Sequence, residues 1–424
     1  MFKQSKPWAL AITLTLALAG CGGGDTTGTE VNTAVQTDTA SVPTETMAAR
    51  QDRLVQLGRQ IFTDRNLSEP AGTACVACHQ PDQGFAGNHG SRVGVALGSL
   101  PGALGLRNAM TNTYQGLVPA FGFITADGKT EAVGGHFWDG RADTLALQAL
   151  GPFLNPLEMN NPSPQAVVAK VAASAYANAF RREFGANIFA NPNTAFTQIG
   201  VAIAAFEQGA LQPFNSKYDA MVRGQVALTP TEARGLALFQ NPVGANCAGC
   251  HLMNPSSGNP ADSPFSEFTY YATGVPRNSA IPANANPAFF DLGLCGPERN
   301  VPVLPPSVAP GTTSDQFCGQ FRMPTLRNVA QRPAFMHNGV FKNLRDVVSF
   351  YATRNSNPQR WYAGSDRPND LPARYLSNLE VSKAPFNRAP GDGPALTEAE
   401  IDDLVAFLHT LSDGFSPPPA PPAP

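Results

Sequence analysis

The chain has 424 residues, of which 42% are hydrophobic and 14% are charged, and its formal net charge is −3. This length suits two domains with flanking segments, and the near-neutral charge without a basic tract argues against a nucleic-acid partner. Glycine and proline are abundant and alternating, strand-like runs are scarce. We therefore expect a mainly α fold in which helices are joined by long irregular loops.

The N-terminus has the features of an export signal. Two lysines precede an apolar run over residues 8–19, which is too short to span a bilayer. A Leu-Ala-Gly-Cys sequence ending at Cys21 then resembles a bacterial lipobox; ordinary signal cleavage with a spare thiol is the alternative. Glycine rather than aspartate follows the cysteine, which favours outer-membrane delivery. Residues 1–21 are thus a predicted lipoprotein signal peptide, lipidated at Cys21, for a periplasmic protein anchored to the outer membrane.

Both ends of the mature chain are predicted to be flexible. Residues 22–50, rich in Gly, Thr, Ser and Val towards their start, form a predicted tether, with order beginning near Met47. Apolar residues with helical spacing follow, from Leu54 to Phe62. The proline-rich residues 416–424 are a predicted extended tail.

Two C-x-x-C-H sequences, at residues 75–79 and 247–251, match the attachment signature of c-type haem. The two thiols add across the vinyl groups of one porphyrin, and the next histidine becomes the proximal iron ligand. A zinc half-site or a redox dithiol is the alternative, but zinc sites need further ligands and a dithiol does not need the histidine. Two motifs in one exported chain predict two covalent haem c groups, held by Cys75, Cys78 and His79, and by Cys247, Cys250 and His251.

The segments before the two motifs are weakly similar to each other. Residues 57–62 read Leu-Gly-Arg-Gln-Ile-Phe and residues 234–239 read Arg-Gly-Leu-Ala-Leu-Phe. Such a repeat predicts two related cytochrome c-like haem domains. A break in the helical pattern near residue 212 places the boundary, which gives an N-terminal domain over 51–212 and a C-terminal domain over 213–415.

Several further helices are predicted along the chain. Residues 164–189 and 194–222 have helical patterns, the second interrupted at 211–214. Capping boxes at Thr229 and Thr397 predict two more helix starts, the last helix covering 399–411. Residues 254–316 form a proline-rich insert without periodicity.

Of the seven cysteines, four belong to the haem motifs and Cys21 to the lipobox. Export permits a disulfide between the remaining two, Cys295 and Cys318. Such a bond would contribute about 3 kcal/mol by restricting the unfolded chain.

The sequence around both motifs resembles the superfamily of di-haem bacterial cytochrome c peroxidases and MauG, from about residue 50 to 413. The most specific segments are 137–141 (Phe-Trp-Asp-Gly-Arg), 158–159 (Glu-Met), 324–328 (Pro-Thr-Leu-Arg-Asn) and 336–339 (Met-His-Asn-Gly). The resemblance implies that the N-terminal haem reacts with hydrogen peroxide and that the C-terminal haem stores or relays electrons.

The resemblance also implies roles for individual side chains. Trp138 matches a tryptophan that lies between the haems, although a buried aromatic beside a turn explains it too. Glu158 matches a distal glutamate that moves a proton between the peroxide oxygens; alone, it would be read as a surface or helix-start charge. Gln148 and Pro152 match other distal positions. Asn108 matches the side-chain ligand of a calcium ion, with the carbonyls of Arg332 and Ala334 completing the set; this last match is loose.

Two positions depart from the peroxidases that need reductive activation. Where those carry a blocking histidine this chain has Val95, so we expect an open first haem; the nearby His89 is an alternative ligand. Where the peroxidases place a methionine on the second haem this chain has Tyr351, as MauG-type members do. A core tyrosine explains its helical spacing equally well.

These residues together predict a di-haem peroxidase of the MauG-like branch, supplied with electrons by a small cytochrome c or a cupredoxin. Two alternatives remain: oxidation of a residue on a partner protein, and a non-enzymatic, membrane-tethered electron-transfer cytochrome.

Overall fold

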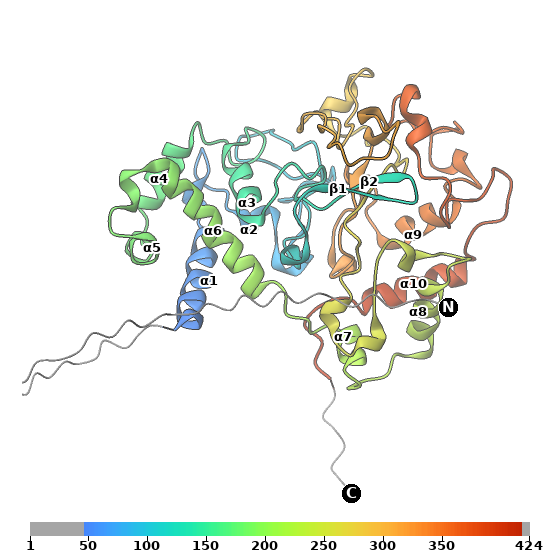
Figure 1. Cartoon of the computed structure of the whole chain (residues 1–424), viewed down its shortest axis with the longest axis horizontal. Coiled ribbons are helices and arrows are strands. Elements are labelled where there is room, and N and C mark those ends of the chain that lie inside the picture. Colours follow the sequence, from blue (N-terminus) through green and yellow to red (C-terminus); the bar gives the residue numbers. More distant parts are fainter. Residues whose placement is uncertain (1–45, 418–424) are drawn as a thin grey trace, which may run out of the picture. The chain divides into compact units, whose positions relative to one another are not determined.

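The computed structural model describes residues 46–417, all of which belong to one compact unit. The signal peptide, Cys21, nearly all of the tether and most of the tail lie outside the described residues. The described part is mainly helical, as predicted, with two small two-stranded sheets (Figure 1). Within residues 46–417, no helix has the length and apolarity needed to cross a bilayer.

The first apolar core lies among helices of the N-terminal half. Helix α1 (Met47–Thr63) lies along α6 (Pro192–Ala210), and α3 (Leu145–Leu154) and α4 (Pro164–Ala172) pack on α6 as well (Figure 1). The predicted tether is therefore too long at its end, because residues 47–50 are helical. Helix α1 begins there because the Thr46 hydroxyl accepts a hydrogen bond from the backbone N–H of Ala49.

The helical pattern over 164–189 gives two helices and not one. Helix α4 ends at Ala172, and α5 spans Ala177–Phe184. Between them the Ser174 hydroxyl donates to the carbonyl of Val171 at 2.7 Å, which offers the backbone an alternative to helical bonding.

The second apolar core lies among α7 (Lys217–Val222), α8 (Pro230–Gln240), α9 (Leu344–Thr353) and α10 (Glu398–His409). Helices α8 and α10 lie side by side. Both predicted capping boxes are present, at the starts of α8 and α10. The described part thus has a separate apolar core behind each C-x-x-C-H sequence.

The glycine that the two similar segments share, Gly58 in the first and Gly235 in the second, lies at a close crossing of two helices. A Cβ on Gly58 of α1 would lie 1.9 Å from the carbonyl oxygen of Ala202 on α6. A Cβ on Gly235 of α8 would lie 2.0 Å from the carbonyl oxygen of Asp403 on α10. In both halves only glycine lets the helix before the motif cross its neighbour this closely.

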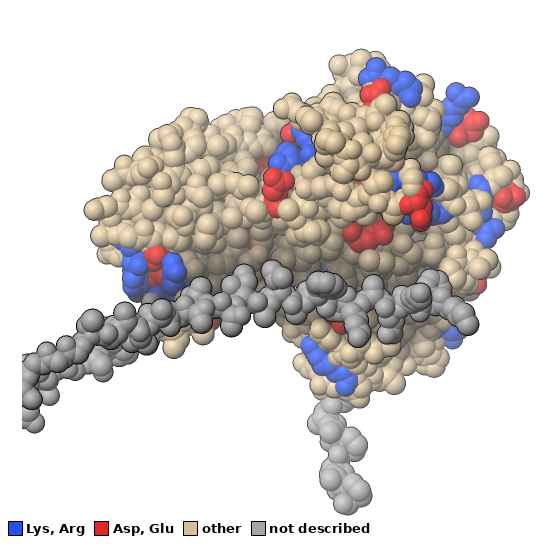
Figure 2. All heavy atoms as spheres, viewed as in Figure 1, with Lys and Arg blue, Asp and Glu red and all other residues tan. Residues whose placement is uncertain are grey.

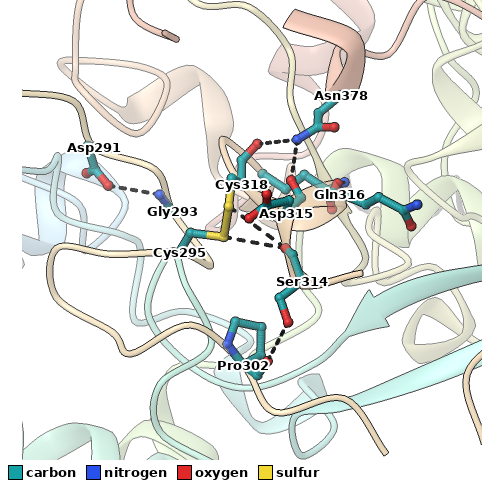
Figure 3. Close-up of a disulfide and its surroundings, with 10 residues drawn as sticks. Asp291, Gly293, Cys295, Pro302, Ser314, Asp315, Gln316, Cys318 and Asn378 are labelled. Atoms are coloured by element: carbon teal, nitrogen blue, oxygen red, sulfur yellow. Dashed lines mark hydrogen bonds between the residues drawn. A yellow bond between two sulfur atoms is a disulfide. The ribbon is translucent and has the colours of Figure 1, made fainter. Parts of the chain in front are cut away.

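A β-hairpin and the proline-rich insert form a third, smaller apolar cluster. Strands β1 (Gly122–Ala126) and β2 (Lys129–Val133) pair antiparallel, as do β3 (Tyr270–Tyr271) and β4 (Phe321–Arg322). A disulfide joins Cys295 to Cys318, the pairing expected from the cysteine count, and Asn378 donates to the Cys318 carbonyl at 3.0 Å (Figure 3). The disulfide and this hydrogen bond thereby connect the insert to later segments of the C-terminal half.

Charged side chains on the face shown in Figure 2 occur as small groups of mixed sign. The viewed face carries no broad basic patch.

Candidate functional site

The first C-x-x-C-H sequence forms a short helix at the wall of a cavity. Helix α2 (Cys75–Cys78) is followed directly by His79. Both free thiols and the imidazole line the cavity. The Nδ1 atom of His79 lies 2.9 Å from the carbonyl oxygen of Phe85. This carbonyl fixes the proton on Nδ1, so Nε2 is left as a metal ligand. Burial lowers the pKa of His79, which keeps the imidazole neutral.

The second motif repeats this arrangement. Nδ1 of His251 lies 2.9 Å from the carbonyl oxygen of Phe265, and burial lowers the pKa of His251 to about 4. Burial also raises the pKa of the Cys247 thiol to about 12 and that of Cys250 to about 11. These thiols stay protonated, and residues 46–417 contain no cluster of three His, Cys, Asp or Glu side chains able to hold a metal. Two free thiols beside a neutral histidine fit the attachment of haem c.

The distal candidates line the first cavity together. Gln148 and Pro152 come from α3, and Glu158 comes from the loop that follows it. Asn155 donates to Oε1 of Glu158 at 2.9 Å. Burial raises the pKa of Glu158 to about 7, and the negative charge of Glu298 adds to this rise. Glu158 can therefore both accept and release a proton near neutral pH.

Trp138 lies in the walls of the first cavity and of a second cavity beside His251. Its indole is buried, and Nε1 donates to the carbonyl oxygen of Asn108 at 2.8 Å. The next residue, Asp139, is fully buried and pairs with Arg107 at 2.7 Å and with Arg141 at 2.9 Å. These ion pairs hold the backbone at Asp139 in place and thereby position the neighbouring Trp138.

The second cavity consists of two neighbouring chambers that share His251 and Tyr351 in their walls. The outer chamber contains Cys247 and Cys250 and is otherwise largely apolar. The inner chamber contains neither cysteine and is lined by Trp138 among others. Tyr351 lies on α9, stacks on Phe386 at a centroid distance of 5.2 Å, and has a pKa raised by burial. The structure thus brings Tyr351 and His251 to one cavity.

The loop after the first motif turns its histidine away from the first cavity. Nδ1 of His89 lies 2.8 Å from the carbonyl oxygen of Leu97, and neither His89 nor the fully buried Val95 lines the cavity. Lys342 and Asn278 hold the loop by donating to the Val93 carbonyl at 2.7 and 2.8 Å.

The candidate calcium residue Asn108 is buried where the two halves meet. Its Nδ2 atom lies 3.0 Å from the carbonyl oxygen of Ala334 and 3.3 Å from that of Met336, while Oδ1 has no partner. If the oxygen and nitrogen of the amide are exchanged, Oδ1 and the two carbonyl oxygens face a common point. Three oxygen atoms arranged in this way are the ligands that a hard cation needs. Met336 thus contributes the second nearby carbonyl, and no contact joins Asn108 to the carbonyl of Arg332 that the resemblance implies.

Sequence reasoning missed two polar residues of the first cavity. Glu207 on α6 is buried, accepts from Asn112, and has a pKa raised to about 8 by burial. His136 is buried too, and burial lowers its pKa to about 4. Each keeps one unpartnered polar atom beside this cavity. The sequence did contain an indication for Glu207, because it follows Ile203 by four residues and so falls on the otherwise apolar face of the predicted helix.

Comparisons with known proteins identify relatives of this chain. A family model described as di-haem cytochrome c peroxidase matches residues 52–227. The methylamine utilization protein MauG of Paracoccus denitrificans is 35% identical over 375 residues, which cover 85% of this chain and 89% of that protein. The cytochrome c551 peroxidase of Nitrosomonas europaea is 27% identical over 310 residues, covering 72% of this chain and 75% of that protein.

One solved structure is particularly similar. The diheme peroxidase BthA of Burkholderia thailandensis has a TM-score of 0.77 and 43% identity, with 85% of this chain and 86% of that chain covered. A BthA variant in which one tyrosine is replaced by methionine has a TM-score of 0.78 and 42% identity over the same shares of both chains.

Proposed function

Because the chain belongs to the di-haem cytochrome c peroxidase family, we propose that it reduces hydrogen peroxide in its first cavity with electrons that enter through the second. The observation that carries the proposal is the asymmetry of two otherwise matching sites. Glu158 and Gln148 line only the first cavity, Tyr351 lines only the second, and Trp138 lines both.

Each motif would hold one haem c through its two cysteines and its histidine, with Tyr351 as the second ligand in the second cavity. Bound haem supplies an iron that can bind peroxide and change its oxidation state. The carbonyls of Phe85 and Phe265 hold the two imidazoles so that each presents Nε2. The surrounding domains would span 51–212 and 213–415.

The protein groups of the first cavity would handle the protons. Reduction of one peroxide molecule takes two electrons and two protons and yields two molecules of water. Glu158 would take a proton from one peroxide oxygen and deliver it to the other, a transfer that its pKa near 7 favours. The Asn155 amide, which donates to Oε1, orients the carboxylate for this transfer.

A second candidate function is oxidation of a residue on a partner protein. Tyr351 favours it, because a phenolate stabilises ferric iron better than a thioether does, and the MauG of P. denitrificans is 35% identical. Either role would fit an exported lipoprotein that is anchored to the outer membrane through Cys21 and faces the periplasm. A small cytochrome c or a cupredoxin would be the electron donor, and Asn108 would hold a calcium ion.

The proposal is tested by following oxidation of a reduced small cytochrome c by the purified di-haem protein. We expect peroxide-dependent oxidation of two donor molecules per peroxide consumed. Replacing Trp138 with phenylalanine should slow electron delivery while both haems are retained. If the donor is not oxidised when peroxide is added, peroxidase function is wrong; oxidation of a protein added in place of the donor would then favour the second candidate.

A further inference from the structure

Unpartnered polar atoms gather around the inner chamber. Three of its lining residues carry a buried side-chain nitrogen or oxygen without a hydrogen-bond partner: Asn108 (Oδ1), Arg322 (Nη1) and Arg332 (Nε). Leaving such an atom unpaired is unfavourable because it has lost its hydrogen bonds to water, and the loss is larger when the group is charged. Two of the three belong to guanidinium groups, which are cations, so the unmet need of the chamber is for negatively charged acceptors.

Arg322 is 1% exposed and has no carboxylate partner in the described part of the chain. Its Nε donates to the carbonyl oxygen of Phe137 at 3.2 Å, and its Nη2 lies 3.4 Å from Oε1 of Gln115. Its remaining nitrogen, Nη1, has no acceptor. Burial lowers the pKa of Arg322 only to about 10, so the buried group stays charged at neutral pH.

Arg332, which lines the same chamber, also has an unpartnered guanidinium nitrogen. Its Nη2 donates to the carbonyl oxygen of Thr325 at 2.7 Å, and its Nε is unpartnered. It lines the same chamber as His251, which places the guanidinium near the second motif. Among residues 46–417, Arg332 also forms no ion pair with a carboxylate.

Other buried arginines of this protein are fully partnered. Arg327 is fully buried and pairs with Asp219 at 3.0 Å. Arg354, 2% exposed, directs all three nitrogens of its guanidinium at oxygens, including the carbonyl of Thr273 at 2.8 Å. The unpaired cations are thus a property of the inner chamber and not of buried arginines in general.

The two chambers are chemically complementary to the two edges of haem c. One edge of the macrocycle carries the thioether bonds, and the opposite edge carries two propionate carboxylates. The cysteines lie only in the outer chamber, and both guanidiniums lie only in the inner one. We propose that the inner chamber is a carboxylate-binding subsite in which Arg322 and Arg332 bind the propionates of the haem attached to Cys247 and Cys250.

Guanidinium groups suit this role because their planar fork matches a carboxylate with two parallel hydrogen bonds. The bound carboxylates would accept hydrogen bonds from the unpaired N–H groups and neutralise the two buried positive charges. The proposal rests on haem attachment at the second motif and is independent of peroxide chemistry. A cation beside the propionates favours the reduced haem, so its removal shifts the midpoint potential of that haem to more negative values.

The test compares Arg322→Gln and Arg332→Gln with the wild-type di-haem protein. We expect both variants to shift the propionate bending band in the resonance Raman spectrum of one and the same haem, and to lower the midpoint potential of that haem. Arg345→Gln is the matched control, because it removes the same charge from the exposed side of α9, where Arg345 pairs with Asp402. The control should leave the band and the potential at their wild-type values.

If a glutamine variant does not mature with two haems, the lysine variant at the same position decides. Lysine keeps the charge and loses the fork, so the band should shift while the potential stays near the wild-type value. Unchanged bands and potentials in variants with both haems would overturn the subsite. A wild-type protein that carries one haem would instead overturn the proposed function.

Discussion

Replacement of Glu158 by glutamine is the most informative perturbation of the first cavity. The substitution keeps the size of the side chain and its place beside Asn155 but removes its ability to take a proton. A positioned acid–base group contributes a factor of about 10²–10⁴ in rate. At about 1.4 kcal/mol per factor of ten, the barrier should rise by about 3–5 kcal/mol.

The pH profile separates proton transfer from a structural effect. The pKa of Glu158 is raised to about 7, and the unprotonated form is the one that accepts a proton from peroxide. The wild-type rate should therefore fall as the pH decreases below about 7. Glu158→Gln should show no such acid limb, because the carboxylate that accepts the peroxide proton is gone.

Glu298→Gln is the matched control, since Glu298 lines the same cavity but pairs with Arg141 at 2.8 Å. We expect most of the rate to be retained. The acid limb should move to lower pH, because the charge of Glu298 helps to raise the pKa of Glu158. Stopped-flow kinetics with peroxide measure all three proteins. A Glu158→Gln protein with both haems and the wild-type rate would refute the assignment.

Three further outcomes are expected. A pyridine haemochrome assay should count two haems per chain, and alanine at both Cys247 and Cys250 should leave one; acid–acetone extraction of haem from the wild type would contradict covalent attachment. Tyr351→Met should raise the midpoint potential of the second haem, since a thioether favours ferrous iron; a Tyr351→Phe protein with an unchanged spectrum would make Tyr351 a core residue. The pKa of Glu207 is raised from 4.5 to about 8, so its ionisation destabilises the fold as the pH rises through this interval. Glu207→Gln should therefore be more stable than the wild type above pH ~8, by up to about 5 kcal/mol, and equal to it near pH ~4. Parallel curves of unfolding free energy against pH would contradict that reasoning.

The sequence was most informative where a local pattern carries the chemistry. The two C-x-x-C-H sequences place cysteines and histidines within one turn, so the walls of both cavities were predictable around His79 and His251. The capping box at Thr229 was equally local, because it depends on a residue only three positions away. The placement of Trp138 between the cavities came from family resemblance, since nothing local fixes it.

Other features depend on contacts between distant segments. Glu207 and His136 meet in the first cavity, although neither stands near the first motif in sequence. Arg322 and Arg332 look like ordinary charged residues until their burial and missing partners are seen. The hairpin β1–β2 was missed because its strands are five residues each and lack a clear alternation of buried and exposed positions.

The loop after the first motif is the part on which the account depends most. Val95 is fully buried, and the ring of His89 is bonded to the Leu97 carbonyl at 2.8 Å, so neither stands ready to ligate an iron in the first cavity. We therefore predict that the first site reacts with peroxide without prior reduction of the protein.

The most direct measurement is the absorption spectrum of the purified all-ferric protein before and after one equivalent of peroxide. We expect a high-spin component at rest and an immediate spectral change when peroxide is added. A purely low-spin resting spectrum, with reactivity only after half-reduction of the protein, would contradict the open first site.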